Sequence, residues 1–263
     1  MDLGLKDRVA IVAASSQGLG KAVAMALARE GARLAICART ARALEAAADH
    51  IRSTTRAEVL ARPIDVTKYV EVRRLVAESV ERFGRIDICV TNAGGPPSKT
   101  FAETSVEDWT AAVNLNLMST IYFAREVLPL MQKQRWGRLI TITSVAVKQP
   151  IEGLILSNSV RSAVSGLVKS LANEYGKYNV LMNNVCPGYT RTERLTELAG
   201  RLAESEGVTT EQIQQRWAGQ IPLGRLAEAE EFGGVVAFLA SERASYITGA
   251  SIAIDGGLVK GVY

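Results

Sequence analysis

The chain has 263 residues, 48% of them apolar, and its 31 Lys and Arg against 27 Asp and Glu give a net charge of +4. This content supports the core of one large α/β domain, and a charge excess this small, without a long basic run, argues against a nucleic-acid partner. The first residues, MDLGLKDR, lack a signal-peptide core, and no apolar run reaches membrane length. We therefore expect a cytoplasmic protein without membrane contact.

The cysteines and the single histidine limit the chemistry that the chain can carry. Cys37, Cys89 and Cys186 are odd in number, lack metal-ligand spacing and lie in or beside apolar runs, so we expect buried free thiols and no metal site. His50 lies in a predicted helix, and nothing near it resembles the strand-turn-helix of a serine hydrolase.

The stretch from Arg8 to Glu30 contains an apolar run, a loop of small residues and an amphipathic pattern in succession. The run predicts a buried parallel strand, and the pattern predicts a helix whose first turn lies at residues 19–21. This order presents backbone N–H groups and the positive end of a helix dipole to a pyrophosphate. A tight turn that binds nothing is the alternative for the loop taken alone.

The loop has the spacing A-x-x-x-G-x-G, with Ala14, Gly18 and Gly20 at the marked positions. Glycine is useful where φ must be positive or where the backbone approaches a ligand closely. Ala14 fits the loop if its φ is negative. In the left-handed region an alanine would be strained by about 1 to 2 kcal/mol.

The second predicted strand, at residues 33–38, bears on the choice of cofactor. In a dinucleotide fold an acid at the end of this strand binds a free ribose 2′-hydroxyl, whereas a basic residue accommodates a 2′-phosphate. Ala38 stands where the acid would be, and Arg39 and Arg42 follow. The sequence therefore favours NADP over NAD, although the two arginines also suit a solvated helix start.

Strands and helices alternate along the rest of the chain, with no internal repeat and no low-complexity linker. This order predicts a single doubly wound parallel sheet with helices on both faces. The expected helices are at about 41–53, 69–83, 105–134, 156–178 and 228–239, with shorter pieces around 193–203 and 210–218, and the expected strands are at 58–63, 86–91, 137–143, 180–185 and 251–254.

Polar residues at special positions mark a candidate site. Asp65 follows a strand and would bind an adenine amino group or cap the next helix. Asn114 and Asn116 lie within a predicted helix, where asparagine is unfavourable, so one of them has a specific partner. Residues 191–225 are polar and mixed beyond a strand end, which is typical of a mobile substrate lid.

In these motifs the chain resembles the short-chain dehydrogenase/reductase family, in particular the β-ketoacyl carrier-protein reductases. The resemblance covers about residues 5 to 257. It implies a Rossmann-type fold, an NADP-dependent oxidoreductase acting on a small carbonyl or alcohol substrate, and a homodimer or homotetramer formed through the helices at 105–134 and 156–178. The motifs that carry it are the loop 13–20, N-A-G at 92–94, Asn116, Ser144, P-G at 187–188, and T-G…D-G-G at 248–249 and 255–257.

The resemblance also implies a set of site residues. The family's catalytic set is Asn, Ser, Tyr and Lys, and its positions here hold Asn116, Ser144, Ser157 and Arg161. The cofactor would be contacted by Ala14, Ser16, Gln17, Gly18, Leu19, Arg39, Asp65, Val66, Asn92, Ala93, Gly94, Arg161, Pro187, Gly188, Thr190 and Thr192.

The sequence S-x-x-x-R at 157–161 departs from the family's Y-x-x-x-K. An aliphatic hydroxyl is a far weaker acid than a phenol, whereas an arginine keeps the positive charge and can bind ribose hydroxyls. Ser157 and Arg161 would also suit a helix N-cap and a solvated arginine.

Three functions follow from this departure. In the first, a reductase stabilises the oxyanion with Ser144, Ser157 and Arg161, and a water or Tyr189 supplies the proton. In the second, the protein binds NADP without turnover, as a sensor or scaffold. In the third, the scaffold carries out another reaction, such as that of a lyase or isomerase.

Overall fold

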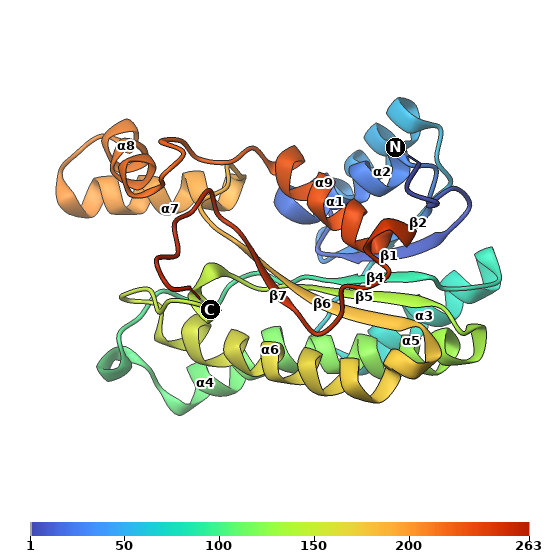
Figure 1. The fold of residues 1–263 in the computed structure, drawn as a ribbon. Helices are drawn as coiled ribbons and strands as arrows, with labels where there is room; N and C mark the ends of the chain where they lie inside the picture. Colours follow the sequence, from blue (N-terminus) through green and yellow to red (C-terminus); the bar gives the residue numbers. More distant parts are fainter. Residues whose placement is uncertain (1, 263) are drawn as a thin grey trace.

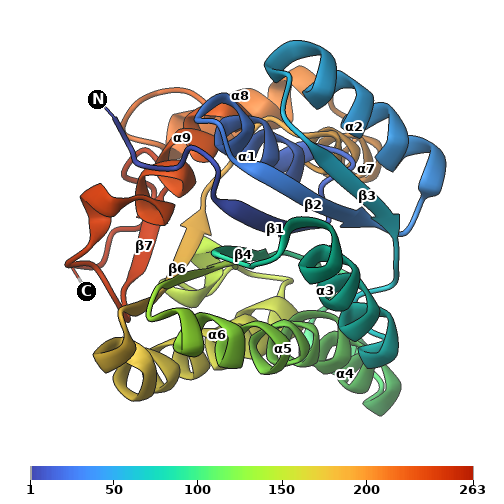
Figure 2. The same cartoon turned by 90° about the vertical axis from the view of Figure 1, so that its right-hand side faces the viewer.

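The computed structural model describes residues 2–262 and contains a seven-stranded parallel sheet with helices on both faces (Figures 1 and 2). The strand order is β3-β2-β1-β4-β5-β6-β7. This arrangement confirms the predicted doubly wound fold. The strands are β1 (Val9–Ala13), β2 (Arg33–Ala38), β3 (Val59–Pro63), β4 (Ile88–Thr91), β5 (Gly137–Ile142), β6 (Val180–Pro187) and β7 (Ser251–Ile254).

The helices form two layers, and two of them extend beyond the sheet. Helices α1, α2 and α9 cover one face, and α3, α5 and α6 cover the other, while α7 and α8 project past one end of the strands (Figure 1). The helices are α1 (Gly18–Arg29), α2 (Ala41–Thr55), α3 (Tyr69–Phe83), α4 (Val106–Ala112), α5 (Ser119–Gln134), α6 (Ile155–Tyr175), α7 (Glu193–Glu206), α8 (Thr210–Gln220) and α9 (Ala229–Ala240).

Strand β1 is buried on both faces, which explains its continuous apolar sequence. Ala10 and Val12 pack with α1 and α9, whereas Val9 and Ile11 pack in the core on the other side of the sheet. Strand β1 pairs with β2 on one side and β4 on the other. In an open parallel sheet, ligands bind at such a switch point, outside the carboxyl ends of the strands.

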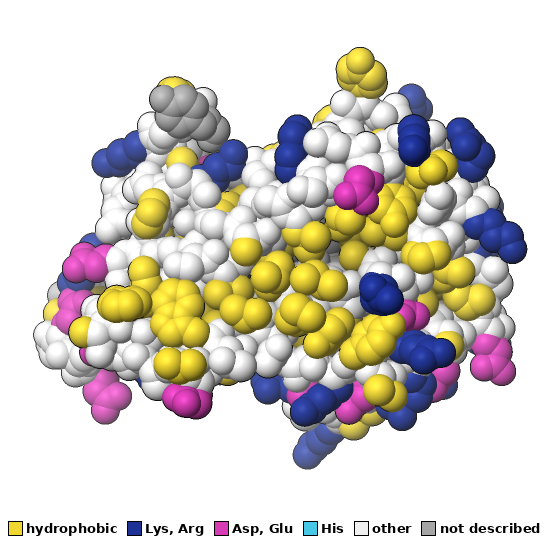
Figure 3. All heavy atoms as spheres, turned by 90° about the horizontal axis from the view of Figure 1, so that it is seen from below, with side chains coloured by type: hydrophobic (Ala, Val, Ile, Leu, Met, Phe, Trp, Pro, Cys, Tyr) yellow, Lys and Arg dark blue, Asp and Glu magenta, His cyan; other side chains and the backbone are white. Residues whose placement is uncertain are grey.

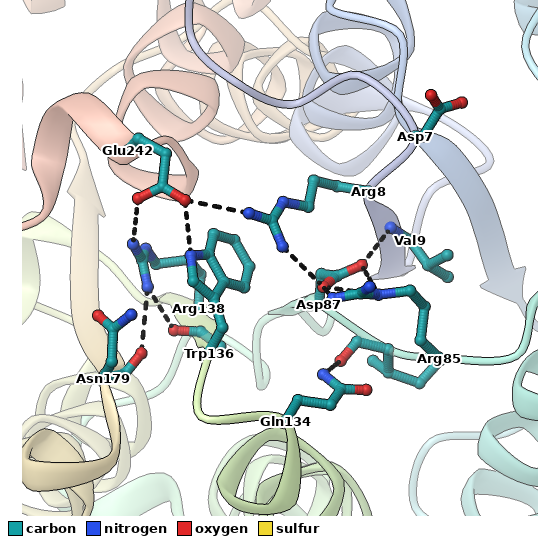
Figure 4. Close-up of polar contacts among 12 residues, drawn as sticks. Asp7, Arg8, Val9, Arg85, Asp87, Gln134, Trp136, Arg138, Asn179 and Glu242 are labelled. Carbon is teal, nitrogen blue, oxygen red and sulfur yellow. Dashed lines mark hydrogen bonds and ion pairs between the residues drawn. The ribbon is translucent and has the colours of Figure 1, made fainter.

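A polar cluster holds the opposite, amino end of the strands together (Figure 4). Asp87 is fully buried, accepts a hydrogen bond of 2.9 Å from the backbone N–H of Val9 and pairs with Arg8 and Arg85. Glu242 accepts hydrogen bonds from Arg8 (3.0 Å) and from the indole Nε1 of Trp136 (2.8 Å). These charges are paired with one another, so we assign this cluster to the stability of the sheet.

The prediction of one continuous α-helix at 105–134 is wrong in the middle of that range. The chain forms α4, then a π-helical segment at Val113–Met118, and then α5. π-Helical turns insert an extra residue, which alters the direction of a side chain, and they are frequent at functional sites. Here Asn116 is buried while Asn114 is exposed, so Asn116 is the asparagine with a specific partner.

Helices α7 and α8 form a small core of their own. Its buried members are Ala199, Ala203, Ile213 and Trp217 of the two helices together with Leu226, and the ring of Tyr189 stacks on Trp217 at 5.0 Å between centroids. This hairpin lies within the stretch 191–225 that the sequence marks as a lid.

Other sequence expectations concern single residues and membrane contact. The three cysteines are free and buried, as predicted. Residues 2–262 hold no helix long and apolar enough to cross a membrane, and no group of three or more His, Cys, Asp or Glu side chains suited to a metal ion.

Candidate functional site

The loop between β1 and α1 is held in an unusual backbone conformation. Ala14 has φ +50°, so the condition for an unstrained alanine is not met, and the residue lies in the left-handed region. A Cβ on Gly20 would come within 2.2 Å of the Ala14 carbonyl oxygen. The glycine therefore permits α1 to pack closely against the end of β1, and the strain remains at Ala14.

The first turn of α1 leaves its N–H groups available. The N-cap residue Gln17 makes no side-chain capping bond, and the first turn contains no acidic residue. The four N-terminal N–H groups of a helix need partners from outside it, and an anion satisfies them well. This uncapped end, beside the small-residue loop, suits the diphosphate of a dinucleotide.

The end of β2 presents positive charge. Arg39 and Arg42 are exposed, and neither forms an ion pair with the described residues. Asp65 accepts hydrogen bonds from the backbone N–H (2.9 Å) and the hydroxyl (2.8 Å) of Thr67. Burial acts to raise the pKa of Asp65, but these hydrogen bonds and the charges of Arg39 and Lys68 outweigh it, so the pKa is lowered.

Arg161 is buried at the carboxyl ends of β4 and β5, which rules out a solvated helix arginine. Its Nη1 donates to the carbonyl oxygens of Ile142 (3.2 Å) and Thr143 (2.8 Å), and its Nη2 to those of Ala93 (3.5 Å) and Gly94 (3.4 Å). Burial lowers the pKa of Arg161 to about 10, and the charge of Arg194 adds to this effect.

Asn116 meets the same loop. Its Nδ2 donates to the Gly94 carbonyl oxygen at 3.0 Å, while its buried Oδ1 has no hydrogen-bond partner. A cavity of about 10 Å³ lies here, which is the space of about one water molecule. A water in this cavity would give Oδ1 its missing donor. The cavity is lined by Thr91, Asn92, Ala93, Asn116, Ser119, Thr120, Ile142, Thr143, Arg161 and Val164.

Ser157 lies one turn before Arg161 on α6, and Ser144 follows β5, at whose end Arg161 binds two carbonyl groups. Ser144 accepts a hydrogen bond from the Ala146 N–H at 3.1 Å. Ser157 is not an N-cap, because α6 begins at Ile155 and its N-cap residue is Leu154. The Ser157 side chain is buried and forms no hydrogen bond with the described part of the chain, so its hydroxyl remains available to a ligand.

Tyr189 does not replace the missing tyrosine in this arrangement. Its ring packs against Trp217 in the small core of α7 and α8, and burial raises the pKa of its phenol. A catalytic acid at neutral pH needs a pKa moved the other way. The described residues show no hydrogen bond between Tyr189 and Ser144, Ser157 or Arg161.

Residues 188–192, after β6, lie between the site and the hairpin of α7 and α8. A Cβ on Gly188 would come within 2.9 Å of Asp255, so this glycine permits close contact with the chain after β7. Thr190 is buried, and the Thr192 side chain caps α7 by accepting from the Leu195 N–H. Thr192 also lies against Gly18 of the loop before α1.

Some of the predicted site residues line or contact the small cavity beside Arg161, and others lie farther along the same edge of the sheet. Asn92, Ala93, Asn116 and Arg161 share the small cavity, and Gly94 binds both Asn116 and Arg161. The other predicted contacts do not line that cavity, but all lie at or just beyond the carboxyl ends of β1, β2, β3 and β6: Ser16, Gln17, Leu19, Arg39, Asp65, Val66 and Pro187.

Asn158 has a role at the site that the sequence did not indicate. Its side chain accepts from the Ile151 N–H (3.2 Å) and donates to the Ile151 carbonyl oxygen (2.8 Å). It thereby fixes the loop between Ser144 and Ser157. The only signal in the sequence is an asparagine in the first turn of a helix, a position where side chains often bind the backbone.

The chain is similar in sequence and in fold to known reductases over nearly its whole length. A family model described as enoyl-(acyl carrier protein) reductase matches residues 13–259. The 3-oxoacyl-[acyl-carrier-protein] reductase FabG of Aquifex aeolicus is 33% identical over 258 residues, which are 98% of this chain and 100% of that protein. That of Synechocystis sp. is 34% identical over 257 residues, 97% and 98% of the two chains.

A solved structure agrees closely in fold. L-sorbose reductase from Gluconobacter frateurii, complexed with NADPH and L-sorbose, has a TM-score of 0.96 to this chain at 32% identity, and each chain is covered to 100%. The similarity extends over the sheet, both helix layers and the hairpin of α7 and α8.

Proposed function

The chain belongs to the short-chain dehydrogenase/reductase family of oxidoreductases, and on this premise we propose that it is an NADP(H)-dependent carbonyl reductase with an altered catalytic set. The observation that carries the proposal is the position of Arg161, whose guanidinium holds a buried positive charge between the ends of β4 and β5. Ser157 lies one turn before it on the same helix, α6, and Ser144 follows β5.

The residues of the site fit NADPH. The uncapped first turn of α1 would hold the diphosphate, and Arg39 and Arg42 would hold the 2′-phosphate. The remaining predicted contacts follow the carboxyl ends of β3, β4 and β6. L-sorbose reductase, which shares the fold, was solved with NADPH. When bound, the cofactor supplies a hydride to the carbonyl carbon of the substrate.

The chain's own residues stabilise the negative charge that develops on the carbonyl oxygen. The hydroxyls of Ser144 and Ser157 donate hydrogen bonds to this oxygen, and the buried Arg161 adds a fixed positive charge. Such preorganised donors are typically worth about 3 kcal/mol each in the transition state. Arg161 cannot release its proton and does not act as the acid.

The proton comes from water in this mechanism. The cavity between Asn116 and Arg161 has room for one water, which the Oδ1 atom of Asn116 would hold as an acceptor. This water donates a proton toward the substrate oxygen. The hydroxide that remains then takes a proton from solvent. Because water is a weaker acid than a phenol, we expect slower turnover than a tyrosine would give.

We also propose that residues 191–225 form the lid of the substrate pocket. The Glu193 carboxylate lies 3.6 Å from the place of a Cβ on Gly18, close to the N–H groups that would bind a diphosphate. Two anions this close repel each other. The first turn of α7 therefore moves when the cofactor binds.

A homodimer or homotetramer is proposed on the face formed by α5 and α6. Figure 3 shows hydrophobic side chains gathered on this face, and a groove of about 440 Å³ lies between the two helices. A second copy of the chain would cover it. The groove is lined by Ile121, Ala124, Arg125, Leu128, Pro129, Leu167, Leu171 and Tyr175.

The proposal is tested by NADPH oxidation with a panel of ketones, β-ketoacyl thioesters and quinones. Consumption of NADPH with formation of the alcohol supports a reductase. Tight NADPH binding without turnover on every substrate would instead favour a sensor or scaffold.

A further inference from the structure

A second arginine reaches the loop after β4 from the lid. Arg194 is the second residue of α7, and its Nη1 lies 3.5 Å from the Gly95 carbonyl oxygen. A Cβ on Gly95 would come within 2.3 Å of the Arg194 Nη2 atom. The guanidinium therefore occupies space that any other residue at position 95 would fill.

Arg194 and Arg161 lie on neighbouring carbonyl groups. Arg161 donates to the oxygen of Gly94, and Arg194 approaches that of Gly95. The two charges are close enough that Arg194 contributes to the lowered pKa of Arg161. Arg161 is buried and Arg194 is exposed, so the two like charges repel each other through a partly solvated environment.

Neither guanidinium is neutralised by a carboxylate within residues 2–262. Three other arginines of the lid are paired: Arg191 with Glu228 at 3.0 Å, Arg216 with Glu206 at 2.8 Å and Arg225 with Glu231 at 2.7 Å. Arg201 forms no ion pair with the described residues, and its charge also lowers the pKa of Arg194. Glu197 lies about one turn along α7 from Arg194; its charge acts to raise the pKa of Arg194, but the two side chains form no ion pair. A cation in the first turn of a helix is also at the unfavourable end of the dipole.

The two arginines differ in the donors that they have left. The Nη atoms of Arg161 are bound to carbonyl oxygens of the protein on every side. Arg194 makes one long hydrogen bond, so most of its N–H groups remain for a ligand. A planar guanidinium with free donors suits bidentate binding of a carboxylate.

We propose that Arg194 binds an anionic group of the substrate, so that the pocket selects oxo acids over neutral ketones. This inference rests on the proposed reductase function, because it assigns a substrate class to the same site. It assigns Arg194 the recognition of charge and leaves Ser144, Ser157 and Arg161 their roles at the carbonyl oxygen. The diphosphate of the cofactor is the other anion that could meet Arg194, and the test separates the two.

The test compares the wild type with Arg194→Gln and with Arg216→Gln, a matched control on the other lid helix. The probes are acetoacetate, 2-oxobutyrate and benzoylformate, each with its methyl ester. Binding is measured to the protein–NADP⁺ complex, which has no hydride to transfer, and kcat/KM is measured with NADPH. The affinity for NADPH is measured separately for each variant.

We expect Arg194→Gln to weaken binding of the acids and lower their kcat/KM by about 10- to 100-fold, the effect of losing one charged hydrogen-bonding partner. Binding of the esters, the affinity for NADPH and all properties of Arg216→Gln should remain as in the wild type.

Equal effects on acids and esters, or no preference for any acid in the wild type, would overturn the inference. A loss of NADPH affinity with unchanged acid binding would assign Arg194 to the cofactor diphosphate and also overturn it. If binding of the acids depends on Arg194 but neither these probes nor the ketones, β-ketoacyl thioesters and quinones are reduced, the inference stands and the proposed reductase function fails.

Discussion

The Nη1 atom of Arg161 lies 2.8 Å from the carbonyl oxygen of Thr143, and this hydrogen bond joins α6 to the carboxyl end of β5. The same guanidinium binds the loop after β4 through Ala93 and Gly94. Arg161, which the family resemblance places at a catalytic lysine position, thus brings a positive charge to the site and also holds α6, β5 and the loop after β4 together.

Replacement of Arg161 should reveal both roles. Arg161→Met keeps the bulk but leaves buried carbonyl groups without donors, so we expect the free energy of unfolding to fall by about 3 kcal/mol. NADPH affinity should fall as well, because the charge is lost. Chemical denaturation and fluorescence titration measure the two effects. Lys169→Met, at an exposed position of α6, is the control and should change neither. Unchanged stability in Arg161→Met would contradict the bracing role.

Replacement of the strained loop residue Ala14 should stabilise the protein, whereas replacement of Arg161 should destabilise it. Ala14 has φ +50°, where glycine is not penalised, so Ala14→Gly should raise the free energy of unfolding by about 1 kcal/mol. Ala46→Gly, at an exposed position within α2, should lower it by about 1 kcal/mol because glycine is a poor helix former. Thermal and urea unfolding compare the two, and destabilisation by Ala14→Gly would show that the loop is not strained there.

The cofactor preference should depend on Arg39. Arg39→Asp replaces a group that attracts a 2′-phosphate with one that repels it and can accept from a ribose hydroxyl. We expect the ratio of NADPH to NADH affinity to fall by at least about 10-fold, one charged interaction being worth this much. Arg73→Asp, an equal charge change at an exposed position of α3, should leave the ratio unchanged. An unaltered ratio in Arg39→Asp would mean that the determinant lies elsewhere.

Restoring the family's residue types tests the account of proton transfer. In Ser157→Tyr with Arg161→Lys, a phenol beside an ammonium group would replace water as the acid. General acid catalysis contributes on the order of 10²-fold, so kcat for a ketone that the wild type reduces should rise by about that factor. Ser157→Tyr alone is the comparison. A double variant that folds and binds NADPH without faster turnover would show that proton transfer does not limit the wild type.

The fold could be predicted almost completely from the sequence, because each strand and helix carries its own hydrophobic pattern. Strands buried on both faces are continuously apolar, as in β1, and helices packed on a sheet show one apolar stripe, as in α3, whose predicted and observed bounds agree. These patterns depend only on which face of an element is buried.

The details of the site depend on contacts between distant segments, which such patterns do not contain. The π-helical turn at Asn116 is tied to Gly94, 22 residues away in the chain. The hydrogen bonds of Arg161 depend on carbonyl groups just after β4 and β5, and a Cβ on Gly20 would clash with the carbonyl oxygen of Ala14. The sequence could name these residues as candidates but could not show how they meet.

The most direct test of the central claim is a titration of the purified protein with NADPH and NADH, followed by absorbance at the nicotinamide band during incubation with carbonyl substrates. The account predicts tighter binding of NADPH than of NADH and oxidation of NADPH by at least one oxo acid or ketone. Binding of NADPH with no oxidation by any carbonyl compound would contradict it.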